Sequence, residues 1–425
     1  MRAEPAIPEP VSSTPAADPR REVAPLVEGP PGDVLYLPRR ARPGFLLFST
    51  PAIGDEEMRE VTDTLRSGWI TTGPKTQQFE AAFTERVGAE DALGLNSCTA
   101  GLHLGLLALG VKAGEEVITT PMTFCACANV IEHLGATPVL ADVEPDTLNI
   151  APAAIEAAIS PRTRAILAVH YAGHPVDLDA IQDLAGRHGV ALIEDAAHAL
   201  PASYKGRLIG SGDNPVAFSF YATKNLTTGE GGMLTGSSEL LARARALSLH
   251  GMSRDAWKRY GQGGSWFYQV EEPGFKYNMT DVQAAMGLAQ LRKLERFQQR
   301  RREIVALYNA AFGSLDALET PVERPEVEHA WHLYVLRLRL GALRIGRDRF
   351  IEELTARNIG TSVHFIPIHL HPYYRQKYQY LPDHFPVAYG AYQRMLSLPL
   401  HPALSDADVS DVVEAVLDVA TRFAR

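Results

Sequence analysis

Two short apolar runs end in side chains that could do chemistry. Residues 190–198 read Val-Ala-Leu-Ile-Glu-Asp-Ala-Ala-His and place Asp195 just past a buried strand. Residues 216–225 read Val-Ala-Phe-Ser-Phe-Tyr-Ala-Thr-Lys-Asn and place Ser219 on a strand and Lys224 in the turn after it. A carboxylate, a hydroxyl and an amine held this way suit a cofactor that forms a Schiff base, carries a protonated ring nitrogen and bears a phosphate. Pyridoxal 5'-phosphate (PLP) has these properties.

Each of these side chains also has a plain structural interpretation. Lysines are usually solvated, but Lys224 follows an apolar strand, and burial would make its amine less basic and more nucleophilic. Asp195 either caps the next helix or forms a charge-assisted hydrogen bond with a ring nitrogen. His198 is either a core histidine bonded to the backbone or a neighbour of the cofactor ring.

A second region offers a phosphate site. Residues 96–101, Asn-Ser-Cys-Thr-Ala-Gly, open an apolar helix. They form a simple N-cap, or they let the backbone amides of Cys98 and Thr99 bind phosphate with the help of the helix dipole. Phe124 follows a strand end and is either a core residue or an aromatic plate stacked on the cofactor.

The remaining pattern must position these groups. Apolar runs predict strands, and helical patterns lie between them. The strands are expected at 116–120, 137–142, 164–170, 190–194 and 216–220, and the helices at 55–66, 79–87, 99–109, 124–134, 152–159 and 177–188. This alternation predicts an α/β fold with a mostly parallel sheet covered by helices on both faces. Ligands of such sheets bind at the carboxyl ends of the strands.

Three parts are expected along the chain. Ten of the 29 prolines lie in the first 45 residues, so residues 1–44 are predicted to be a disordered tail. A long helix at 280–302, with a capping box at its start, leads out of a large cofactor-binding domain at 45–300. Residues 301–425 are predicted to form a smaller α/β domain, with a strand at 333–340 and helices near 347–357 and 405–423.

Composition narrows the class of protein. The net charge of −9 argues against a nucleic-acid or anionic-membrane surface. Neither a membrane-spanning run nor an apolar signal core is evident, so a cytoplasmic location is expected. The three cysteines, Cys98, Cys125 and Cys127, are too few for a disulfide framework, and the Cys-x-Cys spacing lacks a second pair, so no metal site is expected.

At this point the chain resembles the DegT/DnrJ/EryC/StrS sugar aminotransferases among the fold-type-I PLP enzymes. The resemblance runs from about residue 46 to the C-terminus and rests on motifs at 67–74, 96–100, 121–124, 194–199, 218–225 and 274–281. It implies that Lys224 is the Schiff-base lysine, that Asp195 pairs with the ring nitrogen, and that His198 lies by the ring hydroxyl.

The resemblance also assigns the other cofactor contacts. It implies that Ser219 and Thr99 hold the phosphate, that Phe124 stacks on the ring, and that Asn278 reaches the phosphate of a neighbouring subunit. The active sites of a homodimer would then be shared. Cys98 departs from the glycine or alanine that relatives usually carry, which is harmless if its backbone amide alone is used.

Residues 250–278 resemble the subgroup that acts on the 4-keto group of UDP-linked deoxysugars. Arg254 and Trp257 would supply charge and stacking for a nucleotide diphosphate, although such charges also occur on plain solvated loops. His364 recurs near the substrate pocket of the family, or it is structural. The implied activity is transfer of an amino group from an amino acid, glutamate by analogy, to a nucleotide-linked keto-sugar.

Alternatives stay open at this stage. The same chemistry could act on a 3-keto or dTDP-linked sugar, or on a cyclitol. The family also contains deoxysugar dehydratases, but these carry histidine in place of the lysine at position 224. A PLP-binding regulator would need a partner domain or a DNA-binding surface, which the short tail and the acidic balance do not offer.

Overall fold

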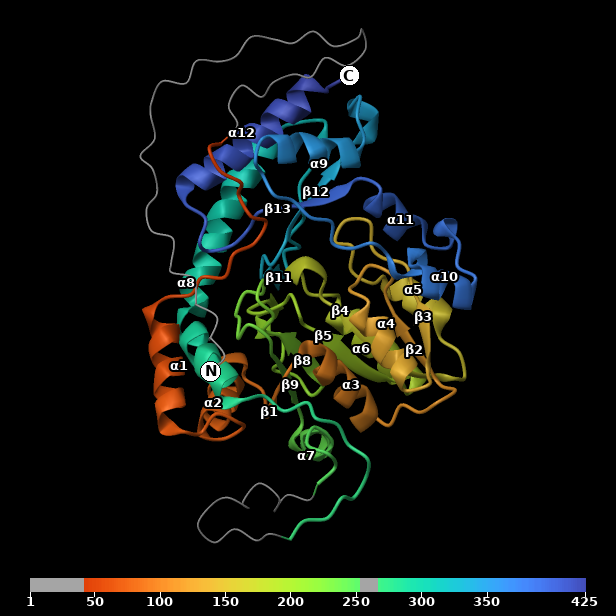
Figure 1. The fold of residues 1–425 in the computed structure, drawn as a ribbon. Helices are drawn as coiled ribbons and strands as arrows, with labels where there is room; N and C mark the ends of the chain where they lie inside the picture. The colour runs from red at the N-terminus through yellow and green to blue at the C-terminus, as the bar shows by residue number, and fades with distance from the viewer. Residues whose placement is uncertain (1–41, 253–266) are drawn as a thin grey trace, which may run out of the picture. The chain divides into compact units, whose positions relative to one another are not determined.

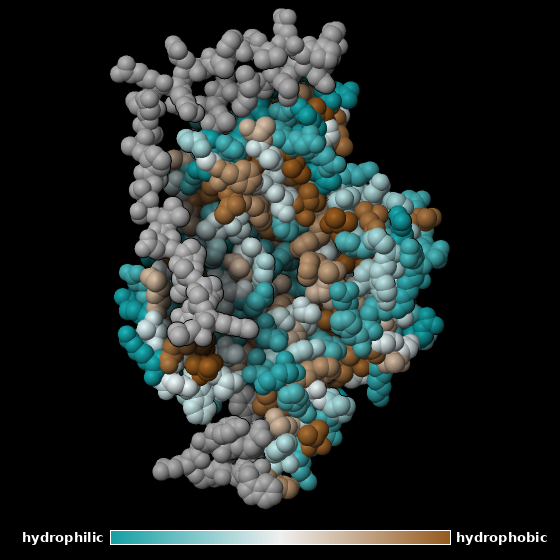
Figure 2. Space-filling model, viewed as in Figure 1, coloured by the Kyte–Doolittle hydropathy of each residue, from teal (hydrophilic) through white to brown (hydrophobic). Residues whose placement is uncertain are grey.

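The computed structural model describes residues 42–252 and 267–425, which belong to a compact unit spanning Arg40–Arg425. The predicted tail at 1–44 lies almost entirely outside the described residues. Hydrophilic residues and smaller hydrophobic patches share the face of the molecule seen in Figure 2. Among the described residues, no helix combines the length and apolar character that a bilayer crossing requires.

A seven-stranded sheet forms the centre of the molecule (Figure 1). Its strands, in spatial order, are β1 (Asp91–Leu95), β9 (Gly232–Gly236), β8 (Val216–Ser219), β5 (Ala191–Asp195), β4 (Thr163–Val169), β2 (Glu116–Thr119) and β3 (Thr137–Leu140). Only the pairs that involve β9 are antiparallel. The predicted α/β fold with a mostly parallel sheet is therefore confirmed, and β9 is an antiparallel insertion that the sequence pattern did not indicate.

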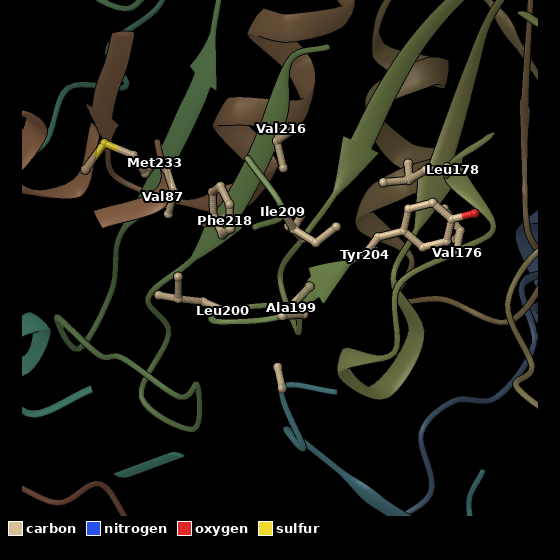
Figure 3. Close-up of a cluster of buried hydrophobic side chains, with 14 of the residues drawn as sticks. Val87, Val176, Leu178, Ala199, Leu200, Tyr204, Ile209, Val216, Phe218 and Met233 are labelled. Carbon is tan, nitrogen blue, oxygen red and sulfur yellow. The ribbon is translucent and has the colours of Figure 1, made fainter. Parts of the chain in front are cut away.

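Both faces of this sheet are covered, because successive side chains of a strand point to opposite sides. Leu192 and Phe218 belong to one core, part of which Figure 3 shows, together with residues of α2 (Pro74–Val87), α5 (Pro152–Ala158), α6 (Leu178–His188) and α8 (Asp281–Phe312). Their neighbours Ile193 and Ala217 belong to the other core, with residues of α3 (Cys98–Ala108), α4 (Ala126–His133) and α7 (Ser238–Leu247).

Helix α8 links this sheet to the C-terminal elements. It begins with the predicted capping box of Thr280 and Gln283 but continues to Phe312, ten residues beyond the predicted end. Its first half packs against α1 (Asp55–Ser67) and α2, and its second half enters a separate core (Figure 1). Residue 300 lies inside this helix, and the division into domains at that point stays a prediction.

The separate core contains α9 (Arg347–Ala356), α12 (Asp406–Arg422) and the sheet β10 (Leu318–Glu319), β12 (Tyr334–Leu338) and β13 (Met395–Leu398). The strand and the two helices predicted in this region are thereby confirmed. Helices α10 (Pro372–Tyr378) and α11 (Pro386–Tyr392) lie against the large-sheet side, and β6 (Ser203–Tyr204), β7 (Arg207–Leu208) and β11 (Val327–Glu328) form a third, small sheet.

Helix α2 begins five residues before the predicted start at residue 79. Pro74 occupies its first turn, where the missing N–H costs nothing. The cap comes from another helix, since the buried carboxylate of Asp281 accepts hydrogen bonds from the backbone N–H groups of Gly73 (2.7 Å), Lys75 (3.0 Å) and Thr76 (2.9 Å). The start of α2 is thus fixed by tertiary contact with α8.

Candidate active site

The predicted functional residues meet at one edge of the large sheet, where the parallel strands end. Strand β5 ends at Asp195 and β8 ends at Ser219, five residues before Lys224. Gly232 pairs with Ser219 and lies so close to the start of α3 that a Cβ atom there would approach the backbone nitrogen of Cys98 to 2.5 Å. This close approach brings the beginning of α3 to the same edge.

Lys224 is partly buried at this edge. Burial lowers the pKa of its amine to about 8, although the charge of Asp195 opposes that shift. Within residues 42–252 and 267–425, no hydrogen bond to its Nζ atom is formed. An amine in this setting is neutral far more often than an ordinary lysine, so it can act as a nucleophile or carry a proton near neutral pH.

Asp195 is almost fully buried, and both of its carboxylate oxygens have donors. Oδ1 accepts the backbone N–H of Ala197 at 2.9 Å and lies 3.8 Å from Sγ of Cys98. Oδ2 accepts a hydrogen bond from Sγ of Cys127 at 3.0 Å. Asp195 therefore caps a turn through its bond with the Ala197 N–H, and not the helix that the structural interpretation expected. Within the described residues this carboxylate forms no salt bridge, and it interacts with the charge of Lys224.

A buried pair supports the strand end beneath Asp195. The neighbouring Glu194 contacts Nε2 of His170 at 3.0 Å and accepts a hydrogen bond from Asn214 at 2.9 Å. Since Nδ1 of His170 accepts the backbone N–H of Val176 at 3.1 Å, its proton must lie on Nε2 and point to Glu194. This pair joins the ends of β4 and β5 below the site.

Three histidines surround the Lys224 amine. Burial, reinforced by Lys224, lowers the pKa of His198 and His332 well below the usual value and that of His364 to about 4, so all three are neutral near pH 7. Nδ1 of His332 contacts Oδ1 of Asn225 at 3.1 Å. Because the amide nitrogen of Asn225 donates to two backbone carbonyls, its oxygen is the acceptor and His332 carries its proton on Nδ1.

Aromatic side chains border the site. Phe124 is 59% exposed, so it is not a core residue. Its ring centroid lies 6.1 Å from that of Phe365, which in turn stacks on His198 at 5.8 Å. His364 contacts Oγ of Ser397 at 2.9 Å through Nδ1. A planar ligand above the strand ends would therefore meet a free aromatic face.

The start of α3 offers donors for an anion. Ser97 caps the helix by accepting the N–H of Ala100 at 3.1 Å. Among the described residues, no hydrogen bond from the N–H groups of Cys98 and Thr99 is formed, as expected for the first residues of a helix. The Ser219 hydroxyl accepts the N–H of Tyr221 at 3.4 Å and keeps its own hydrogen for another acceptor.

These groups fit PLP. An amine of lowered pKa lies beside a buried carboxylate, and free backbone donors lie at a helix N-terminus where a phosphate binds well. Nδ1 of His198 is buried and lacks a hydrogen-bond partner within the described residues, which a ring hydroxyl would supply. The interpretation of His198 as a core histidine bonded to the backbone therefore fails at this atom.

Other predicted site residues lie elsewhere. Asn278 forms a bridge with Leu95 at the end of β1, and its side chain donates to Oγ1 of Thr72 at 2.6 Å rather than to the Lys224 group. Arg254 and Trp257 lie outside the described residues. In the part of the chain that is described, no cluster of His, Cys, Asp and Glu side chains could hold a metal ion.

Sequence reasoning missed three residues of this site. Cys127 contacts Asp195, His332 adjoins His198 with ring centroids 4.4 Å apart, and Phe365 lies between two predicted residues. His332 and Phe365 arrive from the C-terminal part, far away in sequence, where no local pattern marks them. The one available signal was for Phe365, which directly follows the predicted site residue His364 in the sequence.

Comparison with known proteins agrees with this geometry. The model of the DegT/DnrJ/EryC1/StrS aminotransferase family matches residues 51–417. The chain is 54% identical over 377 residues to the spore coat polysaccharide biosynthesis protein SpsC of Bacillus subtilis, covering 88% of this chain and 97% of SpsC.

Solved structures are also similar. Spr1654 of Streptococcus pneumoniae in its PMP form, the aminated form of the cofactor, has 36% identity and a TM-score of 0.84, covering 89% of this chain and 99% of that one. Its PLP form is similar too, with a TM-score of 0.83. The aminotransferase PseC of Helicobacter pylori has 30% identity and a TM-score of 0.83, covering 89% of this chain and all of PseC (100%). The chain therefore belongs to the DegT/DnrJ/EryC1/StrS aminotransferase family and is a PLP-dependent sugar aminotransferase.

Proposed function

We propose that this enzyme transfers an amino group from glutamate to the 4-keto carbon of a UDP-linked deoxysugar, in the cytoplasm, and that Lys224 is its catalytic lysine. The observation that carries the lysine assignment is an amine with a pKa of about 8 beside a buried carboxylate, at the strand ends of a family fold. PLP, when bound, supplies a ring that withdraws electrons from the carbon bearing the amino group.

The roles of the acid and the base follow from burial. Lys224 accepts a proton when its amine is neutral and returns it when the amine is charged, which a pKa near the working pH allows in both directions. Asp195 keeps the ring nitrogen protonated through a charge-assisted hydrogen bond. Because both residues are shielded from water, their electrostatic interaction with a bound cofactor is stronger than it would be in solution.

Five further residues hold the cofactor in this proposal. The N–H groups of Cys98 and Thr99, with the hydroxyls of Thr99 and Ser219, bind the phosphate. Phe124 covers the ring, and His198 donates or accepts at the ring hydroxyl through its unpartnered Nδ1.

The substrate class rests on two supports. The relatives carry carbohydrate names: PseC is an aminotransferase involved in the biosynthesis of pseudoaminic acid, and SpsC is a spore coat polysaccharide biosynthesis protein. The motifs at 250–278, including Arg254 and Trp257, resemble the subgroup that acts on UDP-linked 4-keto sugars. In this proposal His364, which is neutral and interacts with the Lys224 amine, contacts the sugar.

We also propose a homodimer in which Asn278 serves the active site of the partner subunit. The side chain of Asn278 donates a hydrogen bond to Oγ1 of Thr72 in its own chain. Nearby, Trp69 and Ile70 are 41% and 54% exposed, which is the type of surface that a second copy would cover. Sedimentation or light scattering tests the dimer, and Asn278→Ala should weaken PLP retention if the proposal holds.

The lysine assignment is tested by absorbance. Wild-type enzyme should show the visible band of lysine-bound PLP, Lys224→Ala should lack it, and Lys112→Ala, a change at an exposed lysine, should keep it. A band of normal intensity in the Lys224→Ala variant would show that another amine binds the cofactor.

The substrate assignment is tested with a panel of nucleotide keto-sugars that combines UDP or dTDP with a 3-keto or 4-keto group. Each is added to the PMP form, and return of the visible PLP band reports amination. The UDP-linked 4-keto sugar should react fastest. A faster reaction with a dTDP-linked or 3-keto compound would overturn the proposed substrate assignment. Steady-state rates with glutamate should give parallel double-reciprocal lines, whereas intersecting lines would contradict two half-reactions in one site.

A further inference from the structure

Two buried thiols lie against one carboxylate at the cofactor edge of the sheet. Sγ of Cys127 is 3.0 Å from Oδ2 of Asp195, and Sγ of Cys98 is 3.8 Å from Oδ1. Burial raises the pKa of both thiols well above the usual value, and the charge of Asp195 adds to that shift. Both therefore keep their hydrogens and are available as donors.

The hydrogen of Cys98 has a nearer acceptor than Asp195. Its Sγ lies 3.4 Å from the backbone oxygen of Ala217, against 3.8 Å from the carboxylate. Cys127 has no such competitor among the described residues. Its one other polar contact is Oγ1 of Thr123 at 3.1 Å, where either atom could donate.

The direction of this short chain is fixed by counting hydrogens. A thiol has one hydrogen, and the anionic carboxylate is a stronger acceptor than a hydroxyl. Cys127 therefore donates to Asp195, and the Thr123 hydroxyl donates to the sulfur. The buried Cys127 thus holds Oδ2 and is itself held by the buried Thr123, while the Ala197 N–H holds Oδ1.

We propose that Cys127 is a positioning residue, whose thiol fixes the carboxylate of Asp195 in the orientation that meets the ring nitrogen of PLP. The inference rests on the proposed role of Asp195. A thiol is a weak donor, so it orients the carboxylate without drawing away much of its negative charge, and that charge is what holds the ring proton.

Three variants at neighbouring positions test this. Cys127→Ala removes the donor, Cys127→Ser replaces it with another, and Cys125→Ala is the matched control, because this half-buried residue two positions away makes no contact with Asp195. The readouts are the dissociation constant of PLP, measured by titrating apoenzyme, and the pH midpoint of the visible band of lysine-bound PLP.

Cys127→Ala should raise the PLP dissociation constant by up to about tenfold, the effect of losing one hydrogen bond of ordinary net strength, and shift the pH midpoint of the band. Cys127→Ser should restore both values to within about threefold of wild type. Cys125→Ala should match wild type. The proposal is overturned if Cys127→Ala matches Cys125→Ala in both readouts, or if Cys127→Ser is as impaired as Cys127→Ala, which would indicate packing alone.

Variants that carry Asp195→Asn separate the proposal from its premise. In an Asp195→Asn background, Cys127→Ala should have no additional effect on PLP binding, because the two residues act as one unit. If Asp195→Asn binds PLP as wild type does, the role of Asp195 itself is wrong. If Cys127→Ala fails to fold, Thr123→Val serves instead, because it keeps the thiol and removes the hydroxyl that donates to it. An unchanged pH midpoint in that folded variant contradicts the proposed chain of hydrogen bonds from Thr123 through Cys127 to Asp195.

Discussion

The lowered pKa of Lys224 leads to a quantitative prediction for the apoenzyme. With a pKa of about 8, about a quarter of the Lys224 amines are neutral at about pH 7.5, against about one in a thousand for an ordinary lysine. Lys224 should therefore react with a small amine-reactive reagent some 200-fold faster than an ordinary lysine, before any correction for access of the reagent. Burial favours the neutral amine, whereas the carboxylate of Asp195 favours the charged one.

Asp195→Asn is the informative perturbation. Removing the carboxylate charge leaves burial unopposed, so the Lys224 midpoint should fall by about one unit. The assay is acylation of apoenzyme across a pH series, with the modified peptides quantified by mass spectrometry and the exposed Lys112 as the internal reference for reagent strength. The reasoning is refuted if the Lys224 midpoint lies at the pH of an ordinary lysine, or if it rises in Asp195→Asn.

Three further outcomes are expected. Gly232→Ala should lower the free energy of unfolding by about 2 kcal/mol or more and weaken PLP binding, because its Cβ would clash with the backbone of Ser97 and Cys98. Denaturant melts measure the stability and titration measures PLP binding. If neither changes, α3 can move to accommodate the methyl group. Asp281→Ala should destabilise the protein by about 2 kcal/mol in urea unfolding, since it leaves the first N–H groups of α2 uncapped; Asp281→Asn should lose less. Lys224→Met should make the apoenzyme more stable than wild type below about pH 8, because the buried wild-type amine is charged there. This difference in stability should shrink as pH rises through about 8. Thermal melts across a pH series measure it, and the opposite trend would show that burial of the amine is not the cause.

Much of the fold followed from local patterns in the chain. Strands β5 and β8 are buried at all but one residue each, so apolar runs mark them, and parallel strands bring their ends to one edge. Asp195 and Lys224 could therefore be expected together before any coordinates. Strand β9 was not predicted, because it has glycine at both ends and follows a glycine-rich turn, and both features are typical of a loop. Strands β1 and β8 pair with it on its two sides, and α3 and α7 pack against it.

The sequence by itself determined the alternation of strands and helices, the chemical types at the strand ends and the family to which the chain belongs, because each depends on short-range order. Tertiary structure decided which side chains touch. The cap that Asp281 gives to α2, the thiol of Cys127 on Asp195, and the approach of His332 to His198 join segments far apart in the chain. Such contacts depend on the direction and spacing of packed elements, which periodicity along the chain does not encode.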